Sequence, residues 1–186
     1  GNPNVGKSTL FNNLTGMNQH TGNWPGKTVA NAQGYCQSEK NSFVMVDIPG
    51  TYSLMAHSAE EEVARNFICF GNPDAVLVVC DATCLERNIN LVLQTLEISD
   101  NVIVCVNLLD EAKRKKIKID LPLLSRRLGT KVIGITARKK KSARKVLDLL
   151  DYEKPQNQYK IKYCDEIEKA ITMIEPVLQK KDMGKI

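Results

Sequence analysis

The N-terminal residues combine glycine, lysine and serine at the spacing of a phosphate-binding loop. Residues 1–8 read GNPNVGKS, which fits the pattern GxxxxGK[ST]. Glycines let the backbone curl so that its N–H groups surround phosphates, and Lys7 would place a positive charge against the terminal phosphates. The Ser8 hydroxyl is a hard oxygen ligand for Mg²⁺, and a helix after the loop adds the positive end of its dipole. The predicted phosphate site consists of Gly1, Asn2, Pro3, Asn4, Val5, Gly6, Lys7, Ser8 and Thr9.

A second motif, DIPG at residues 47–50, closes an apolar run. Asp47 at a strand end can hold Mg²⁺ through water. Gly50 can offer its N–H to a γ-phosphate because no side chain blocks the approach. A plain strand-ending turn would have the same sequence, but the phosphate loop upstream favours the Mg²⁺ and phosphate interpretation.

A third motif points to the base of the nucleotide. The carboxylate of Asp110, in the sequence NLLD that begins at Asn107, can accept two hydrogen bonds from the N1–H and N2–H₂ edge of guanine. Adenine lacks that donor pair, and a buried acceptor left without a donor costs about 1–3 kcal/mol. The motif therefore predicts GTP rather than ATP. Thr136, Ala137 and Arg138 close the last strand-like run and are placed like a backbone turn that contacts guanine O6, which is a weak signal by itself.

Strand-like runs alternate with helical patterns, which indicates an α/β fold. The last three runs are apolar on both alternations, as expected of parallel strands covered on both faces. We predict a Ras-like P-loop GTPase fold, with a mostly parallel sheet and helices on both faces, whose motifs all lie at strand C-termini. The expected strands are 29–36, 43–47, 75–81, 102–107 and 131–136, and the expected helices are 7–15, 58–70, 85–98, 121–128 and 142–150.

The two ends of the chain suggest a piece of a larger architecture. A phosphate loop normally follows a strand, so we expect a G domain over residues 1–151 whose first strand is missing or truncated. Residues 152–159 are polar and read as a linker. Beyond them, Ile167, Ile171, Ile174 and Leu178 recur at helical spacing, which predicts a partial helical subdomain within 152–186. This stripe either docks on the main domain or packs on helices outside the chain.

Composition limits the alternatives. The chain has 186 residues, 42% of them hydrophobic and 25% charged, and no apolar run approaches the roughly 20 residues of a membrane-spanning helix. No signal peptide is visible. The six cysteines form no CxxC pair and favour a reducing cytosolic compartment. Iron ligation by Cys80 and Cys84 is disfavoured, since no histidine or carboxylate cluster accompanies them.

Most of the net charge of +5 comes from basic runs at 113–116 and 138–145. These runs fit two solvated surfaces, a face turned toward anionic lipid, or an RNA contact. No aromatic residues interleave with them, which argues against single-stranded RNA.

Several longer segments resemble the ferrous iron transport protein B (FeoB) family. Residues 22–29, GNWPGKTV, look like its first switch, and residues 47–54, DIPGTYSL, resemble its second. Residues 81–88, DATCLERN, resemble the segment leading into its next helix, and 159–178 are similar to the start of its helical subdomain. The resemblance covers nearly the whole chain.

The resemblance implies a cytosolic GTPase domain fused to a region that carries Fe²⁺ across a bacterial-type inner membrane. It implies GTP and GDP as ligands, the protein's own membrane region as a partner, and no nucleic acid partner, and it leaves self-association open. Asn4 would help to bind K⁺, and Thr28 would join Ser8 and Asp47 as a Mg²⁺ ligand. The implied first switch comprises Gly22, Asn23, Trp24, Pro25, Gly26, Lys27 and Thr28.

Some positions depart from the pattern. Thr51 stands where Ras-like proteins carry a catalytic glutamine, so we expect slow intrinsic hydrolysis. Leu108 replaces a common lysine, Lys27 replaces a small apolar residue, and 139–142 replace a loop that usually contains glycine. Two other functions stay open: a ribosome- or tRNA-associated GTPase, suggested by the basic runs, and a non-hydrolysing nucleotide-binding scaffold, suggested by the missing glutamine.

Overall fold

The computed structural model describes residues 1–16, 19–24, 29–55, 57–151 and 162–182. The strands in these ranges are β1 (Gln19–Asn23), β2 (Ala30–Gln37), β3 (Ser42–Asp47), β4 (Val76–Asp81), β5 (Val102–Asn107) and β6 (Lys131–Gly134). The helices are α1 (Lys7–Thr15), α2 (Ala59–Phe70), α3 (Leu85–Ile98), α4 (Leu109–Arg114), α5 (Leu121–Leu128), α6 (Lys140–Asp151) and α7 (Asp165–Asp182).

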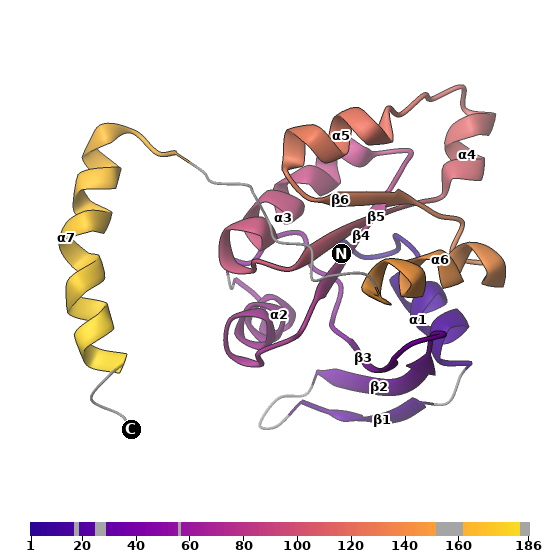
Figure 1. Cartoon of the computed structure of the whole chain (residues 1–186), viewed down its shortest axis with the longest axis horizontal. Coiled ribbons are helices and arrows are strands. Elements are labelled where there is room, and N and C mark those ends of the chain that lie inside the picture. The colour runs from indigo at the N-terminus through magenta and orange to yellow at the C-terminus, as the bar shows by residue number, and fades with distance from the viewer. Residues whose placement is uncertain (17–18, 25–28, 56, 152–161, 183–186) are drawn as a thin grey trace.

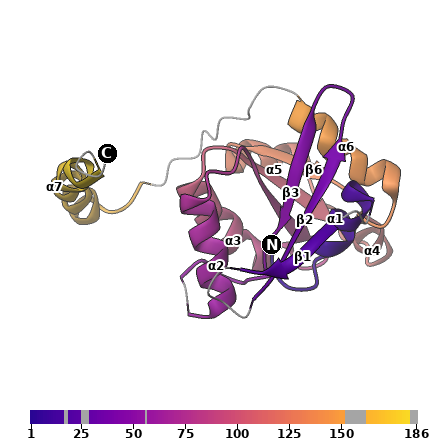
Figure 2. The same cartoon turned by 90° about the horizontal axis from the view of Figure 1, so that it is seen from below.

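The described strands form two three-stranded sheets (Figures 1 and 2). In the first, β1, β2 and β3 are antiparallel neighbours, with Ala32 of β2 opposite Asp47 of β3. In the second, β4, β5 and β6 are parallel, with Val76 opposite Val102 and Ile103 opposite Lys131. The sequence prediction that the last three strands are parallel is therefore confirmed.

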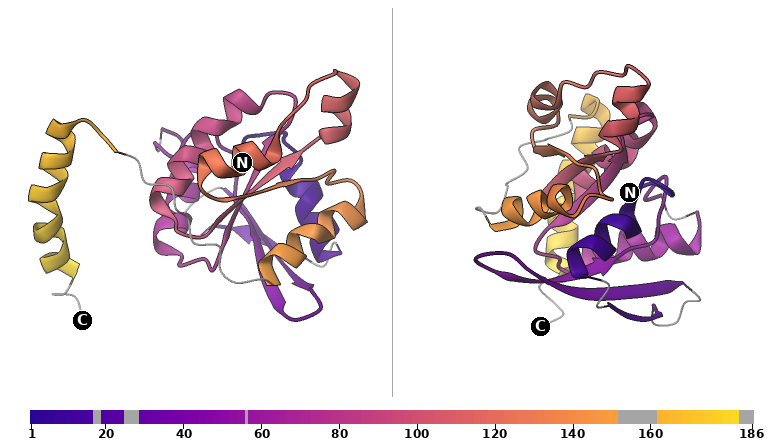
Figure 3. Two further views of the ribbon diagram at one scale, coloured as in Figure 1. Left: turned by 45° about the horizontal axis from the view of Figure 1, so that its top comes forward. Right: turned by 90° about the vertical axis from the view of Figure 1, so that its right-hand side faces the viewer.

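Helices cover both faces of the parallel sheet because alternate strand residues point to opposite sides (Figure 3). Val78 and Val104 belong to a core shared with α2, α3 and α5. Val79 and Cys105 belong to a second core shared with α1 and α6. The central strand β5 is buried along its whole length, which explains its continuous run of apolar residues.

A cleft separates the two sheets. It has a volume of about 670 Å³ and runs between β3 and β4, and its lining includes Val44 and Val46 of β3 and Leu77 and Val79 of β4. In the described residues β3 pairs only with β2, and β4 pairs only with β5. Gly1 lies against β4: a Cβ added there would stand 2.4 Å from the carbonyl oxygen of Val79.

The predicted elements all appear, and the helix predictions at 7–15, 85–98 and 121–128 have the observed bounds. Helix α2 begins with a side-chain cap, since Ser58 Oγ accepts from the Glu61 N–H at 3.1 Å. Strand β1 and helix α4 were not predicted. The sequence of β1, QHTGN, has no apolar alternation and is held by pairing with β2. Helix α4 is too short to show a helical period.

Several boundaries differ from the prediction by one residue, and two differ by two residues. Strand β6 ends at Gly134 rather than at residue 136, and α6 begins at Lys140 rather than at 142. The turn between them is closed by hydrogen bonds from Lys139 N–H to the Thr136 carbonyl at 2.8 Å and from Thr136 N–H to Ser142 Oγ at 2.9 Å. Ile135 still donates its N–H to the Val106 carbonyl of β5 at 2.8 Å, and the turn begins at the next residue.

Helix α7 stands apart from the α/β domain (Figures 1 and 3). Three members of its predicted apolar stripe, Ile167, Ile171 and Ile174, are between 43% and 54% exposed. Just before the helix, the Tyr163 hydroxyl donates to Glu97 of α3 at 2.6 Å. The predicted linker, 152–159, lies outside the described residues. In the part of the chain that is described, no helix combines the length and the hydrophobicity needed to span a membrane.

Candidate nucleotide-binding site

The N-terminal loop folds as a cradle at the start of α1. Gly6 has a left-handed backbone (φ 86°), and the helix begins at the next residue, Lys7. A side chain at Gly6 would collide with Asn107, because its Cβ would lie 2.3 Å from Asn107 Nδ2. Asn4 is also left-handed (φ 61°). An open cavity of about 490 Å³ lies against the loop and is lined by Asn2, Pro3, Asn4, Gly6, Lys7, Ser8, Thr9 and Gly50.

Three polar side chains meet beside this cavity. Lys7 Nζ lies 2.6 Å from Asp47 Oδ1, and Ser8 Oγ donates to Asp47 Oδ2 at 3.2 Å. Asp47 is the last residue of β3, so the strand end delivers a carboxylate to the first turn of α1. A hydroxyl and a carboxylate side by side are the oxygen donors that Mg²⁺ prefers, so these residues fit that ion. Thr28, the third Mg²⁺ ligand suggested by the sequence, lies outside the described residues.

The segment after β3 is fastened to the loop. The Thr51 N–H donates to the Gly1 carbonyl at 3.2 Å, and a Cβ at Gly50 would stand 3.1 Å from Pro3 Cα. Thr51 itself is 4% exposed, and its hydroxyl donates to the Ser53 carbonyl at 2.5 Å. The hydroxyl of Thr51 is therefore engaged inside the protein and is not free to orient a water molecule in the cavity.

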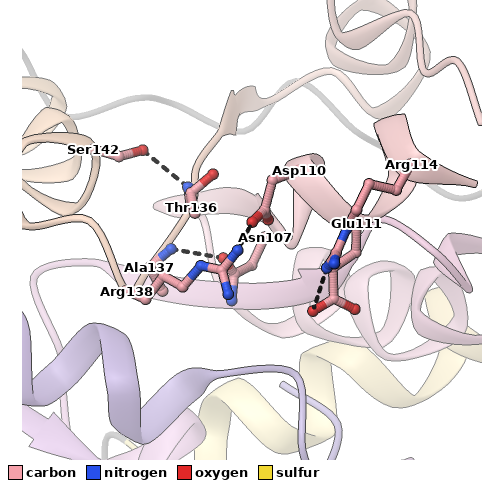
Figure 4. A network of polar contacts seen from close by, with 8 residues as sticks. All are labelled: Asn107, Asp110, Glu111, Arg114, Thr136, Ala137, Arg138 and Ser142. Carbon is pink, nitrogen blue, oxygen red and sulfur yellow. Dashed lines mark hydrogen bonds and ion pairs between the residues drawn. The ribbon is translucent and has the colours of Figure 1, made fainter.

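Asn107 joins the phosphate loop to the loop after β6. Its Nδ2 donates to the Val5 carbonyl at 2.9 Å, and its Oδ1 accepts from the Ala137 N–H at 2.8 Å (Figure 4). The Ala137 carbonyl accepts from Asn13 Nδ2 at 2.6 Å. Sequence reasoning assigned Asn107 and Ala137 to the base. In the structure, the Asn107 side chain and the Ala137 N–H hold the two loops together at one edge. Asn13 was missed, since nothing in its local sequence distinguishes it from a surface asparagine.

The predicted base-selecting carboxylate lies at the start of α4. Asp110 occupies the first turn of that helix, after Leu108 in a left-handed conformation (φ 62°). Arg138, from the loop after β6, donates from its guanidinium to Asp110 Oδ2 (Figure 4). The other oxygen, Oδ1, is buried and has no hydrogen-bond partner in the described structure. The structure therefore brings two of the predicted base-site residues into direct contact.

This environment favours the ionised form of Asp110. Desolvation opposes ionisation, but four attractive contributions together outweigh it. They are the positive charge of Arg138, its hydrogen bond, and the N–H groups of Asp110 and Glu111 at the helix start. The pKa of Asp110 consequently lies below its usual value.

The described part of the predicted first switch touches α2. Gly22 and Asn23 end strand β1, and the ring of Trp24 meets that of Phe67 edge to face, with centroids 5.2 Å apart. The backbone N–H of Trp24 donates to the Val29 carbonyl at 2.9 Å, which joins the two ends of the predicted first switch. The remaining predicted residues, 25–28, lie outside the described residues.

The cysteines behave mainly as small hydrophobic side chains. Cys36, Cys80 and Cys105 are buried, and burial raises the pKa of the Cys80 and Cys105 thiols to about 12. Desolvation also raises the pKa of Cys84. Within the described ranges, no three histidine, cysteine, aspartate or glutamate side chains converge as a metal site.

A phosphate loop around the start of α1 and a base loop after β5, held at one edge of an α/β layer, place this chain among the P-loop GTPase domains. The family model described as ferrous iron transport protein B matches residues 1–150. The chain belongs to that family.

Relatives and solved structures agree with this assignment. The chain is 38% identical over 200 aligned residues to the Fe(2+) transporter FeoB of Escherichia coli K12, which covers 99% of this chain and 25% of that protein. The structure is similar to the cytosolic domain of T. maritima FeoB in its GMPPNP form, with TM-score 0.89, 34% identity, and coverage of 97% and 72% of the two chains. The GDP form II of that domain gives TM-score 0.87 and 32% identity at the same coverage. The chain spans about a quarter of the length of the curated relatives.

Proposed function

We propose that this chain binds GTP and GDP and slowly hydrolyses GTP to GDP and phosphate, with Mg²⁺ and with stimulation by K⁺. The observation that carries the proposal is the bridge made by Asn107. One buried side chain bonds the phosphate loop at Val5 and the base loop at Ala137, so the phosphate cavity and Asp110 belong to one site. A nucleotide is the ligand that needs both.

The phosphate end supplies binding and charge. In the nucleotide complex, Lys7 leaves Asp47 and contacts the terminal phosphates, while backbone N–H groups of the loop and α1 surround them. Ser8 and Asp47 would hold Mg²⁺, with Thr28 from the first switch as the further ligand that the family resemblance implies. Mg²⁺, when bound, supplies positive charge against the phosphate oxygens.

The expected rate of hydrolysis is low because Thr51 is unavailable to orient water, its hydroxyl being bonded to Ser53. Stimulation by K⁺ is assigned to Asn4, whose exposed side chain borders the phosphate cavity. An amide oxygen there is a suitable ligand for a monovalent cation that adds positive charge beside the phosphates, the role of an arginine finger in other GTPases.

We also propose that the domain is the cytoplasmic switch of an Fe²⁺ transporter of the inner membrane. Support comes from the curated relatives, which are named Fe(2+) transporters and of which this chain spans about a quarter. The edge-to-face contact of Trp24 with Phe67 links the first switch to α2, the helix that follows the second switch. Ordering of the first switch around a γ-phosphate would therefore change the contacts of α2.

The domain proposal includes one more strand. The cleft between β3 and β4 has apolar walls and two strand edges that pair with no other described strand. We infer that a further strand of the full-length protein completes the layer there, and that α7 continues into a helical subdomain. Amide hydrogen exchange would test the strand. Protection along β3 and β4 should rise in the full-length protein, and equal exchange in both forms would exclude it.

Calorimetric titration tests the central proposal. GDP and GTP should bind in the presence of Mg²⁺, and ATP should bind far more weakly. Phosphate release should be slow and faster in K⁺ than in Na⁺. ATP binding without GTP binding would contradict the proposed base specificity, and absence of phosphate release would leave a binding scaffold only.

A further inference from the structure

We propose that Arg138 is an internal competitor of the guanine base: it occupies Asp110 when no nucleotide is bound and must leave before the base can dock. The inference rests on the proposed function, because it assumes that Asp110 selects guanine. The sequence placed Arg138 only in a turn that contacts the base. The proposal gives this residue a further role, which is to control how tightly and how fast the nucleotide binds.

The chemical basis is a likeness between the two donors. A guanidinium is planar and presents N–H donors in a fixed fork that suits a carboxylate. The N1–H and N2–H₂ edge of guanine offers a similar pair of donors. Arg138 already donates to Asp110 Oδ2 (Figure 4), and that oxygen cannot serve the base at full strength until the arginine withdraws.

The contact between Arg138 and Asp110 uses only part of the carboxylate, so a better donor can replace the arginine. Arg138 donates to only one of the two Asp110 oxygens, and the other, Oδ1, is stabilised by no side-chain donor in the described structure. Guanine, with two donors, can satisfy both oxygens. The base therefore outcompetes the arginine, although part of its binding free energy is used to release it.

The backbone around Arg138 keeps the competitor in reach. Ala137, the preceding residue, is held on both sides, by Asn107 at its N–H and by Asn13 at its carbonyl. Lys139, the following residue, donates its N–H to the Thr136 carbonyl. The side chain of Arg138 is 59% exposed, so the guanidinium can swing into solvent without moving this turn.

The test compares Arg138→Ala with Lys139→Ala. Both variants remove one positive charge from an exposed position of the same loop, but only the first removes the donor to Asp110. Association and dissociation of a fluorescent GDP would be followed by stopped flow, with melting temperatures to verify folding. Arg138→Ala should bind GDP about two- to fivefold more tightly than Lys139→Ala, mainly through faster association, as expected for loss of an exposed ion pair.

Salt provides an independent arm. In 0.5 M NaCl screening weakens the arginine–carboxylate pair, so the advantage of Arg138→Ala should shrink. Equal or weaker GDP binding by Arg138→Ala than by Lys139→Ala at low salt would overturn the competitor role, and weaker binding would assign Arg138 to contact with the bound base. Failure of the wild-type chain to bind GDP would instead refute the proposed function.

Discussion

The two ends of the candidate site each hold an ion pair, but the pairs have opposite relations to a nucleotide. At the phosphate end, Lys7 Nζ lies 2.6 Å from Asp47. At the base end, Arg138 bonds Asp110. In the proposed complex, a nucleotide with Mg²⁺ would give new partners to both members of the first pair, since Lys7 would contact phosphate and Asp47 would hold the metal. At the second pair the nucleotide would give a new partner only to Asp110, and Arg138 would be displaced.

The difference shows why a charge contact in a binding site cannot be interpreted from its geometry alone. The first pair keeps two ligand-binding groups in place and partly shielded from water, with exposed fractions of 21% and 16%. The second pair has exposed fractions of 59% and 24%. Removing the cation should therefore weaken nucleotide binding at the phosphate end and strengthen it at the base end.

The largest effect is expected for Lys7→Ala. The substitution removes the positive charge from the phosphate cavity and leaves Asp47 unpaired beside incoming phosphates. Loss of one partner from a shielded charge pair predicts a fall in GTP affinity of about 100-fold. Calorimetry would measure it, with Lys139→Ala as the control for net charge. An affinity similar to that of the control would show that Lys7 is not a phosphate ligand and would break the contrast between the two ends.

The next largest effect is expected for Asp110→Asn. The amide replaces one carboxylate acceptor with a donor, which leaves a donor of guanine facing a donor of the protein. Such mismatches cost about 10- to 100-fold in affinity. Xanthine has a carbonyl in place of the 2-amino group, so the affinity of the variant for xanthine nucleotides should rise relative to its affinity for guanine nucleotides. Competition between GDP and xanthosine diphosphate would measure the shift, and unchanged preference would mean that another group selects the base.

Asn4→Ala sharpens the description of the phosphate end. Loss of one amide ligand at the cavity should lower K⁺-stimulated phosphate release by about tenfold, to the rate measured in Na⁺. GDP affinity should change little, because Lys7 and the loop backbone remain. A variant that is still activated by K⁺ would show that the cation binds elsewhere.

Much of this site follows from the sequence because its chemistry is local. The turn at Gly6, the serine after Lys7 and the aspartate that ends β3 follow from spacing alone, and apolar runs give the buried strands. The link between the phosphate loop and the base loop does not follow from the sequence, because Asn13 and Asn107 are 124 and 30 residues away from Ala137, which they contact. Strand β1 was missed for a similar reason, since its partner rather than its own pattern makes it a strand.

The Arg138–Asp110 contact was also beyond local reasoning. Both residues were assigned to the base, but their types gave no sign that they would bond each other across 28 positions. The positive φ of Leu108, which turns the chain into α4 and sets Asp110 in its first turn, is likewise unexpected for a leucine. Local patterns predicted the members of the base loop, but only the fold shows that two of them are in contact.

The smallest expected effect concerns pH and isolates the base-end pair. The pKa of Asp110 is lowered in the folded protein, so the stabilisation that its ion pair gives to the fold is present above the unfolded pKa, about 3.8. It is lost as pH falls through the still lower folded value. Asp110 therefore stays ionised between pH 5.5 and 8, and the ratio of GDP affinities of Arg138→Ala and wild type should be constant across roughly that range. Fluorescence titration at several pH values measures the ratio, with Lys139→Ala as control. A ratio that varies within this range would require another titrating group at the base, and the competition would then involve more than the arginine and one carboxylate.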